Sequence, residues 1–262
     1  GWVSEVMTTS PDILANLDLT DVQDDPFPHV TVDTCLPSEL YSTLSGTMPT
    51  PRFGPDTPSN MLSLASPFQP PLAGRLNPAW QAFIDHHISA AFFASVLRVM
   101  GPSILKTYPE LERNLGKPLD QATVSWHGSD TDTDIQMDVQ FAFNSPVREV
   151  SSVRGPHVDK PRRLISGLLY MPQSGDAAGG ELMLYRFKGR PKLRGVMADP
   201  DDVAEVSRVP YDANRLILFL NGPTSVHGVM PRQVTDGVRR YVNLFVDVRA
   251  PLFRTTAAGG AD

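Results

Sequence analysis

The 262-residue sequence has almost no cysteine and no long apolar run, and each absence excludes a class of protein. Cys35 is the only cysteine, so an intrachain disulfide is excluded, and we expect a reducing compartment. No apolar run approaches the roughly 18 residues that a membrane span requires. No basic start followed by an apolar stretch marks a signal peptide. We therefore expect a cytoplasmic protein that has no membrane partner.

An excess of basic residues is also missing, since the formal net charge is −6. A protein that binds a nucleic-acid backbone needs a basic face, so we expect no nucleic-acid partner. Charged residues make up 20% of the chain and hydrophobic residues 41%, which is typical of a globular protein. The length suits one compact domain. Nothing in the sequence predicts the oligomeric state.

The first 115 residues are predicted to form helices and loops. Residues 27–33 alternate as a short strand, and residues 36–46 read as a helix. Residues 47–77 are rich in Pro, Ser and Gly without a sustained period, which predicts a long surface loop. An amphipathic helix follows from Asn77-Pro78 and is expected to end at Gly101-Pro102. We expect residues 1–115 to pack as an extension on the rest of the domain.

Strand patterns dominate the second half of the chain. Residues 135–144 alternate between apolar and polar side chains, and apolar runs separated by Gly/Pro-rich turns continue to residue 248. This series predicts a mainly β fold with flanking helices, a double-stranded β-helix of the jelly-roll or cupin type, over residues 116–250. Residues 251–262 are expected to be a frayed tail. Gln140 lies on the polar face of the strand predicted at residues 135–144.

Three side chains are candidates for a metal centre. Residues two apart in an extended strand point the same way, so His157 and Asp159 can present an imidazole and a carboxylate on one face. His227, in Ser225-Val226-His227-Gly228-Val229, is the candidate third ligand. Two histidines and one carboxylate are typical of non-haem Fe(II) oxygenases, because the opposite coordination positions stay open. The alternative for a His-x-Asp pair is a hydrogen-bonded pair on the surface. His87 is expected to be a core histidine, and His127 is assigned no role.

The order of these motifs resembles that of the 2-oxoglutarate- and Fe(II)-dependent dioxygenases, and within them the prolyl-4-hydroxylase-like branch. The His-x-Asp element precedes an aliphatic strand that ends in Tyr170, and Gly-Gly-Glu-Leu follows at residues 179–182. An Asn-x-x-x-Ser-x-His-Gly-Val motif spans residues 221–229 and precedes an Arg-Tyr strand. Pro26 to Asp33 resembles the opening of many bacterial and phage members. The resemblance covers roughly residues 26 to 248.

The resemblance implies Fe(II), 2-oxoglutarate and O2 as cofactor and cosubstrates, with ascorbate as a stimulating reductant. It assigns His157, Asp159 and His227 to the metal. The far carboxylate of 2-oxoglutarate needs a fixed cation, and a bidentate Arg is the usual partner. Arg240 matches the family position better than Arg239, which faces the opposite way in an ideal strand. The Tyr170 hydroxyl matches a position that binds the same carboxylate, and the alternative for Tyr170 is an aromatic residue of the barrel wall. Ser166 lies on the same face and is a further candidate contact to the cosubstrate.

The resemblance further implies hydroxylation of an unactivated C–H bond with release of succinate and CO2. Asp159 favours hydroxylation over halogenation, because related halogenases have a small residue at the carboxylate position, where it makes room for a halide. The expected substrate is a peptidyl proline, an amino acid or another small molecule, and residues 47–77 and 186–208 are the expected specificity elements. Two alternatives are a cupin-like protein that binds a metal or sugar without turnover and a zinc-dependent hydrolase.

Overall fold

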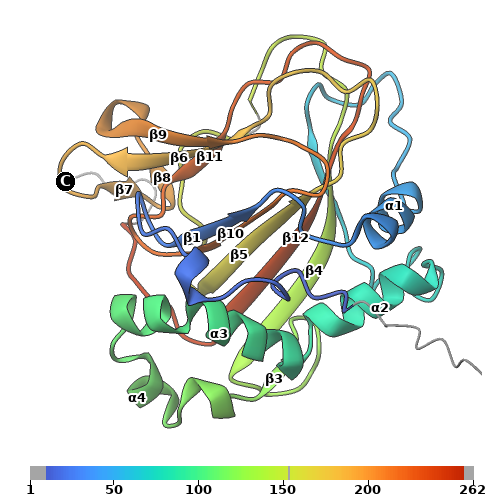
Figure 1. Ribbon diagram of the computed structural model, residues 1–262. Helices are drawn as coiled ribbons and strands as arrows, with labels where there is room; N and C mark the ends of the chain where they lie inside the picture. Colours follow the sequence, from blue (N-terminus) through green and yellow to red (C-terminus); the bar gives the residue numbers. More distant parts are fainter. Residues whose placement is uncertain (1–9, 153, 257–262) are drawn as a thin grey trace, which may run out of the picture.

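Two β-sheets face each other across the interior of the protein, and helices cover the outer face of the larger sheet (Figure 1). The computed structural model describes residues 10–152 and 154–256. The larger sheet has the strand order β1-β10-β5-β12-β4-β2, and β3 pairs with β4 in parallel. Its strands are β1 (His29–Val32), β2 (Leu62–Ala65), β3 (Val124–Trp126), β4 (Ile135–Asn144), β5 (Arg163–Tyr170), β10 (Leu216–Leu220) and β12 (Arg239–Val248).

The smaller sheet has the order β11-β6-β9 and lies opposite the larger one (Figure 1). Its strands are antiparallel, and a separate two-stranded ribbon lies beside it. The strands are β6 (Leu182–Phe187), β9 (Val203–Val209) and β11 (His227–Val229), and the ribbon is β7 (Leu193–Arg194) with β8 (Met197–Ala198). The two facing sheets form a double-stranded β-helix, as the sequence predicted.

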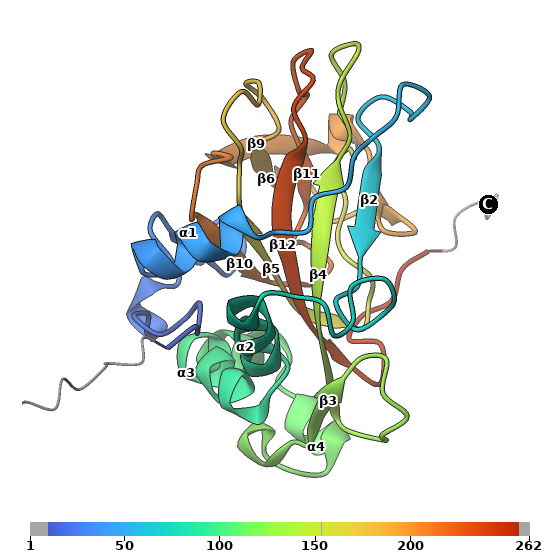
Figure 2. The same cartoon turned by 90° about the vertical axis from the view of Figure 1, so that its right-hand side faces the viewer.

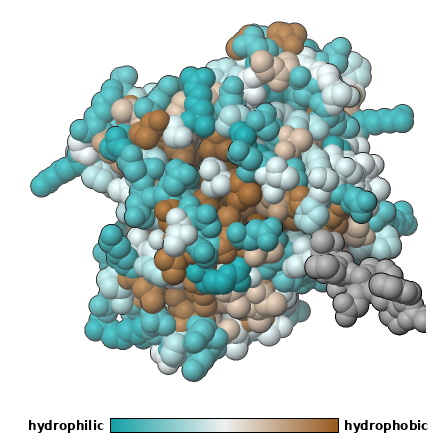
Figure 3. Space-filling view, in the orientation of Figure 1, coloured by the Kyte–Doolittle hydropathy of each residue, from teal (hydrophilic) through white to brown (hydrophobic). Residues whose placement is uncertain are grey.

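The helices pack their apolar sides against the outer face of the larger sheet (Figure 2). The Trp80 ring meets the Phe141 ring of β4 edge-on, with ring centroids 4.8 Å apart. The α-helices are α1 (Ser38–Gly46), α2 (Pro78–His87), α3 (Ala90–Thr107) and α4 (Leu111–Leu115), and the short 3-10 helices are η1 (Leu19–Asp21), η2 (Leu119–Gln121) and η3 (Pro200–Asp202). Apolar side chains also gather across the middle of the surface seen in Figure 3, ringed by hydrophilic ones.

The expected single helix ending at Gly101-Pro102 is wrong in two respects. Ser89 separates two helices, because its hydroxyl caps α3 by accepting a hydrogen bond from the Phe92 amide at 3.3 Å. α3 then continues through Pro102 to Thr107. Burial of Met100 and Ile104 on either side of the proline offsets the cost of a proline inside a helix.

Residues before 115 contribute more than helices and loops. β1 pairs with β10, and β2 lies inside the expected loop 47–77 and pairs with β4. Both strands are four residues long, and β2 lies in a Pro-rich segment, so its sequence pattern is too short to recognise. The larger sheet therefore crosses the predicted boundary at 115–116, and the division into domains stays a prediction. Of the predicted tail, residues 257–262 lie outside the described residues.

One bent pair of helices in the described part of the chain has the length and composition of a membrane span. No single helix among residues 10–152 and 154–256 is long and apolar enough to cross a membrane. α2 and α3 pass that test only together, across a bend of 59°. Both helices bury aromatic side chains in the core, Trp80 and Phe83 from α2 and Phe92 from α3.

Alternation along β12 decides which side chains reach the space between the sheets. Val242, Leu244 and Val246 belong to the core under the helices. Arg239, Tyr241 and Asn243 have the opposite phase and line a pocket between the sheets. β12 runs antiparallel to β5, with Tyr241 opposite Tyr170 and Phe245 opposite Ser166. The inner face of these two central strands is therefore the wall on which the candidate site is built.

Candidate active site

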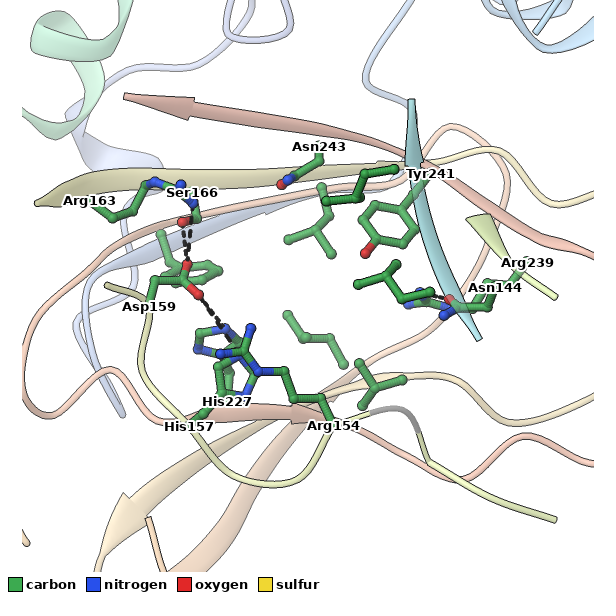
Figure 4. Close-up of a pocket in the computed structure, with 16 residues that line it drawn as sticks. Asn144, Arg154, His157, Asp159, Arg163, Ser166, His227, Arg239, Tyr241 and Asn243 are labelled. Carbon is green, nitrogen blue, oxygen red and sulfur yellow. Dashed lines mark hydrogen bonds and ion pairs between the residues drawn. The ribbon is translucent and has the colours of Figure 1, made fainter. Parts of the chain in front are cut away.

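A pocket of about 250 Å³ lies between the two sheets and contains the three predicted metal ligands at one end (Figure 4). His157, Asp159 and His227 each offer a ligand atom, and these atoms lie within 4.8 Å of one another. The Asp159 Oδ1 atom is 3.8 Å from His157 Nε2 and 3.6 Å from His227 Nε2. The structure thus brings together three residues from two segments some seventy positions apart.

Backbone pairing holds the two histidines side by side. The His157 amide donates to the His227 carbonyl, and the reverse bond is also formed, each at 2.9 Å. The two imidazole centroids are 4.3 Å apart. Gly228 permits this approach, since a Cβ atom there would lie 3.2 Å from the Gly155 carbonyl. The Gly after His227 therefore suits the close approach of the two backbones.

Each histidine is held in the tautomer that a metal ligand needs. Nδ1 of His157 is 2.8 Å from the Gly155 carbonyl, and Nδ1 of His227 is 2.9 Å from the Ser225 carbonyl. A carbonyl can only accept, so each Nδ1 carries the proton and each Nε2 keeps its lone pair. Burial and the neighbouring His227 and Arg154 lower the pKa of His157 to about 3. His157 is therefore neutral at physiological pH.

Asp159 presents one oxygen to the histidines and has the other engaged. The Ser166 hydroxyl donates to Oδ2, and Arg163 Nη1 lies 4.0 Å from the same oxygen. Burial alone would raise the pKa of Asp159, but His227, Arg163 and His157 outweigh it and lower that pKa well below its usual range. Oδ1 is left to face the two Nε2 atoms, an arrangement that suits one-oxygen coordination.

Asn221 joins the two loops that carry the ligands. Its Oδ1 accepts from the Asp159 amide at 3.1 Å and from the Ser225 hydroxyl at 3.0 Å. Its Nδ2 donates to the carbonyls of Lys160 and Arg163. Asn221 and Ser225 thereby shape the turn before His227.

The opposite end of the pocket is built around Arg239. This side chain is 1% exposed, and its Nη1 donates to Asn144 Oδ1 at 3.0 Å. Its guanidinium carbon lies 4.8 Å from the ring centre of Tyr241 and 5.4 Å from that of Tyr170. Gly180 makes room for it, because a Cβ atom there would lie 3.2 Å from Arg239 Nε.

Three buried donors at this end have no hydrogen-bond partner in the part of the chain that the structure describes. They are Arg239 Nε, Arg239 Nη2 and the Tyr170 hydroxyl. Burial raises the pKa of Tyr170 to about 12, so the hydroxyl keeps its proton. Unpaired buried donors cost free energy, and a buried guanidinium costs most. An anionic group could accept hydrogen bonds from all three donors.

The expected orientation of the two neighbouring arginines is wrong. Arg240 points away from the pocket, and its Nε donates to the Met171 carbonyl at 2.9 Å. Its two terminal nitrogens bond the hydroxyls of Thr50 and Ser45 at 3.0 and 2.9 Å. Because adjacent strand residues face opposite sides, Arg239 is the arginine that lines the pocket.

The other predicted site residues are placed as follows. Ser166 lines the pocket, but its hydroxyl bonds Asp159. Tyr170 is fully buried behind Tyr241, with ring centroids 6.3 Å apart. Gln140 lies near the site through its contact with Asn243, whose Nδ2 is 3.3 Å from Gln140 Oε1. Residues lining the pocket that sequence reasoning did not assign include Asn144, Arg154, Arg163, Tyr241 and Asn243.

His87 and His127, which the sequence analysis assigned to no metal, lie away from the cluster. His87 is 1% exposed, accepts at Nε2 from the Ile13 amide at 3.2 Å and contacts the Phe83 carbonyl through Nδ1 at 2.6 Å. It is the satisfied core histidine that the sequence predicted. His127 Nε2 lies 3.7 Å from Asp247, away from the three-residue cluster.

Residues 147–247 match the sequence model of the 2OG-Fe(II) oxygenase superfamily. The matched segment contains the His-Asp-His cluster and Arg239. Over this segment, and at these ligand positions, the chain is similar to the 2OG-Fe(II) oxygenases. Members of this superfamily use Fe(II), 2-oxoglutarate and O2, and the cluster could hold the iron. No curated protein sequence matches this chain at a significant level.

Several solved structures resemble this chain at low identity. A prolyl-4-hydroxylase from Pseudomonas putida is 15% identical with a TM-score of 0.45, and the match covers 85% of this chain and 93% of that one. A Trichoplax adhaerens prolyl hydroxylase in complex with a hypoxia-inducible-factor peptide fragment is 13% identical with a TM-score of 0.42, covering 84% and 83%. Similarity at this level does not extend to the substrate.

Proposed function

We propose that this protein hydroxylates an unactivated C–H bond of a peptidyl-proline, amino-acid or other small-molecule substrate, with release of succinate and CO2. In this proposal His157, Asp159 and His227 hold Fe(II). Arg239, with the Tyr170 hydroxyl beside it, binds the far carboxylate of 2-oxoglutarate. The observation that carries the proposal is the set of three unpaired buried donors at the opposite end of the pocket from the metal cluster.

The donor set fits the proposed cofactor and cosubstrate. Two neutral imidazoles and one carboxylate suit Fe(II) and leave other coordination positions open. A partly compensated cation at one end and a buried guanidinium at the other match a molecule with two separated carboxylates. When bound, Fe(II) and 2-oxoglutarate supply the activation of O2 that C–H hydroxylation requires.

Residues of the protein orient the metal ligands and exclude water from the reacting centre. The fixed tautomers of His157 and His227 direct both Nε2 atoms to one point. The Phe219 ring packs against the His227 ring with centroids 4.6 Å apart. Leu168 and Leu182 line the pocket and help to exclude water from the reacting centre. A carboxylate is present at position 159, so the vacant ligand position of the related halogenases is absent here, which favours hydroxylation.

Succinate release tests this function. The purified protein with Fe(II), 2-oxoglutarate, ascorbate and O2 is expected to form succinate, and Asp159→Ala is expected to abolish it by removing the one anionic ligand. The fold of the variant should be retained, as checked by circular dichroism, because the apolar strands do not depend on Asp159. Succinate formation at the wild-type rate by Asp159→Ala with bound iron verified would refute the assignment.

A further inference from the structure

The pocket carries more positive charge than the cosubstrate can neutralise. Three arginines line it, Arg154, Arg163 and Arg239, and Asp159 is the one acidic residue among the described residues that do so. Bound Fe(II) would add two positive charges, and 2-oxoglutarate would remove two. An excess of cationic groups therefore remains beside the metal cluster, in a protein whose net charge is −6.

Two of the three arginines already have partners. Arg239 bonds Asn144 and faces the proposed cosubstrate position. Arg163 Nε donates to Asp247 at 2.5 Å, and the Arg163 guanidinium stacks 3.6 Å above the Phe245 ring. Both interactions hold Arg163 against the wall of the larger sheet.

Arg154 is placed differently, at the mouth of the pocket next to the imidazoles (Figure 4). Its backbone is fixed, because its carbonyl accepts from the Val229 amide of β11 at 3.1 Å. The residue is exposed, and in Figure 4 its side chain extends toward the two imidazoles, with which it lines the same pocket.

Part of the pocket lining is apolar. Leu62 and Leu64 of the edge strand β2 are 40% and 51% exposed and line the pocket. Val229 continues this apolar lining from the smaller sheet. Exposed leucines on an edge strand favour contact with an apolar body rather than with water.

We propose that Arg154 selects a substrate that carries an oxyanion, a carboxylate or a phosphate, attached to an apolar carbon chain that lies against Leu62 and Leu64. This inference deepens the proposed function and rests on it. The planar guanidinium matches either oxyanion with paired hydrogen bonds. A substrate ammonium would find no carboxylate to pair with, since Asp159 is engaged by Ser166 and directed at the metal cluster.

Calorimetric titration of three matched probes tests this inference without turnover. Hexanoate, hexyl phosphate and the neutral hexanamide are titrated into the full chain loaded with Mn(II) in place of Fe(II) and with saturating 2-oxoglutarate, so that the Arg239 position is filled. At least one oxyanion should bind roughly tenfold more tightly than hexanamide, the effect of one charge-assisted hydrogen bond. The tighter of the two oxyanions identifies the substrate group.

Variants of single arginines show which residue causes the oxyanion preference. Arg154→Gln should reduce the preference to near equality, and Arg154→Lys should keep part of it. Arg113→Gln, at an exposed arginine of α4 outside the expected specificity elements, should leave it unchanged. Equal binding of all three probes, no binding of any probe, or a preference that survives Arg154→Gln would overturn the inference. Failure of 2-oxoglutarate itself to bind would instead refute the proposed function, and that binding is measured first.

Discussion

At the scale of single residues, the metal cluster depends on which atom of each ligand is left free. Carbonyls occupy the Nδ1 side of both histidines, and Ser166 occupies one oxygen of Asp159. The three remaining ligand atoms converge because their other hydrogen-bonding sites are already filled. Ser166 was expected from the sequence to contact the cosubstrate, and its bond to Asp159 gives it a positioning role.

Ser166→Ala is predicted to weaken Fe(II) binding by about tenfold or more, the usual effect of losing a partner of a metal ligand. The free carboxylate oxygen could then rotate away from the position that the two imidazoles share. Anaerobic Fe(II) titration followed by calorimetry measures the effect. Ser207→Ala, an exposed serine of β9, is the matched control. Equal Fe(II) affinity in the two variants would show that Ser166 does not position Asp159.

At the scale of elements, one buried amide bonds both of the loops that carry the metal ligands. Asn221 bonds the backbone after His157 on one side and the turn before His227 on the other. Tyr108, at the end of α3, also donates from its hydroxyl to the Asn221 carbonyl at 2.6 Å. The helical layer is thereby connected to the metal-binding loops.

Asn221→Ala is predicted to lower both thermal stability and Fe(II) affinity, because several buried hydrogen bonds of about 1 kcal/mol each are lost. Asn214→Gly is the control. Asn214 is also a buried amide, bonded to Leu36, and glycine tolerates its φ of 62°. The control should lose stability and keep its Fe(II) affinity. If Asn221→Ala loses stability alone, the amide is structural and does not position the ligands.

The elements also show which features the sequence could predict. Long alternating runs such as β4 and β12, and the paired motifs around His157 and His227, were recognisable because their periods are regular. β2 was missed because four residues in a Pro-rich segment give too short a pattern. The arginine that faces the pocket was mispredicted for a different reason, since family position alone did not fix the phase of β12.

A signal for the correct arginine was present in the strand itself. Val242, Leu244 and Val246 are uniformly apolar and mark the face buried under the helices. Tyr241, Asn243 and Asp247 share the other face with Arg239, and polar side chains inside a central strand indicate a lined site. Arg154 and Arg163 could not be assigned from sequence, because their positions depend on loop geometry and on stacking against Phe245.

At the scale of the whole molecule, buried neutral histidines link folding to pH. Burial lowers the pKa of His87 to about 3, and its two ring nitrogens are satisfied only in the neutral form. The groups that face it are His86, beside it on α2, and Asp12, whose carboxylate bonds Ser95 and His86. The unfolded chain takes up a proton at about pH 6.5, well above the folded pKa.

The metal-free protein is therefore predicted to lose stability as pH falls from 6.5 toward 3, with a His87 contribution of about 2 kcal/mol at pH 5. Above pH 6.5 His87 is neutral in both the folded and the unfolded chain, so its effect on the free energy of unfolding no longer changes with pH. Urea unfolding at pH 7.5 and pH 5.0 measures the loss in wild type and in His87→Gln, which lacks the titrating ring. The variant should be less stable at pH 7.5 but less sensitive to acid. An equal loss in both proteins would contradict the assignment to His87.

The claim that one pocket holds both Fe(II) and 2-oxoglutarate is tested most directly by cosubstrate binding to arginine variants. Anaerobic titration of 2-oxoglutarate into the Fe(II)-loaded protein, followed by its visible charge-transfer absorption, gives the Kd. Arg239→Ala should cost about 2–5 kcal/mol, which raises the Kd well over tenfold, while Fe(II) affinity stays nearly unchanged. Arg240→Gln should lower thermal stability, because Arg240 bonds Met171, Thr50 and Ser45, and should leave the Kd close to wild type. A large rise in Kd for Arg240→Gln with none for Arg239→Ala, or no rise for either variant, would contradict the account.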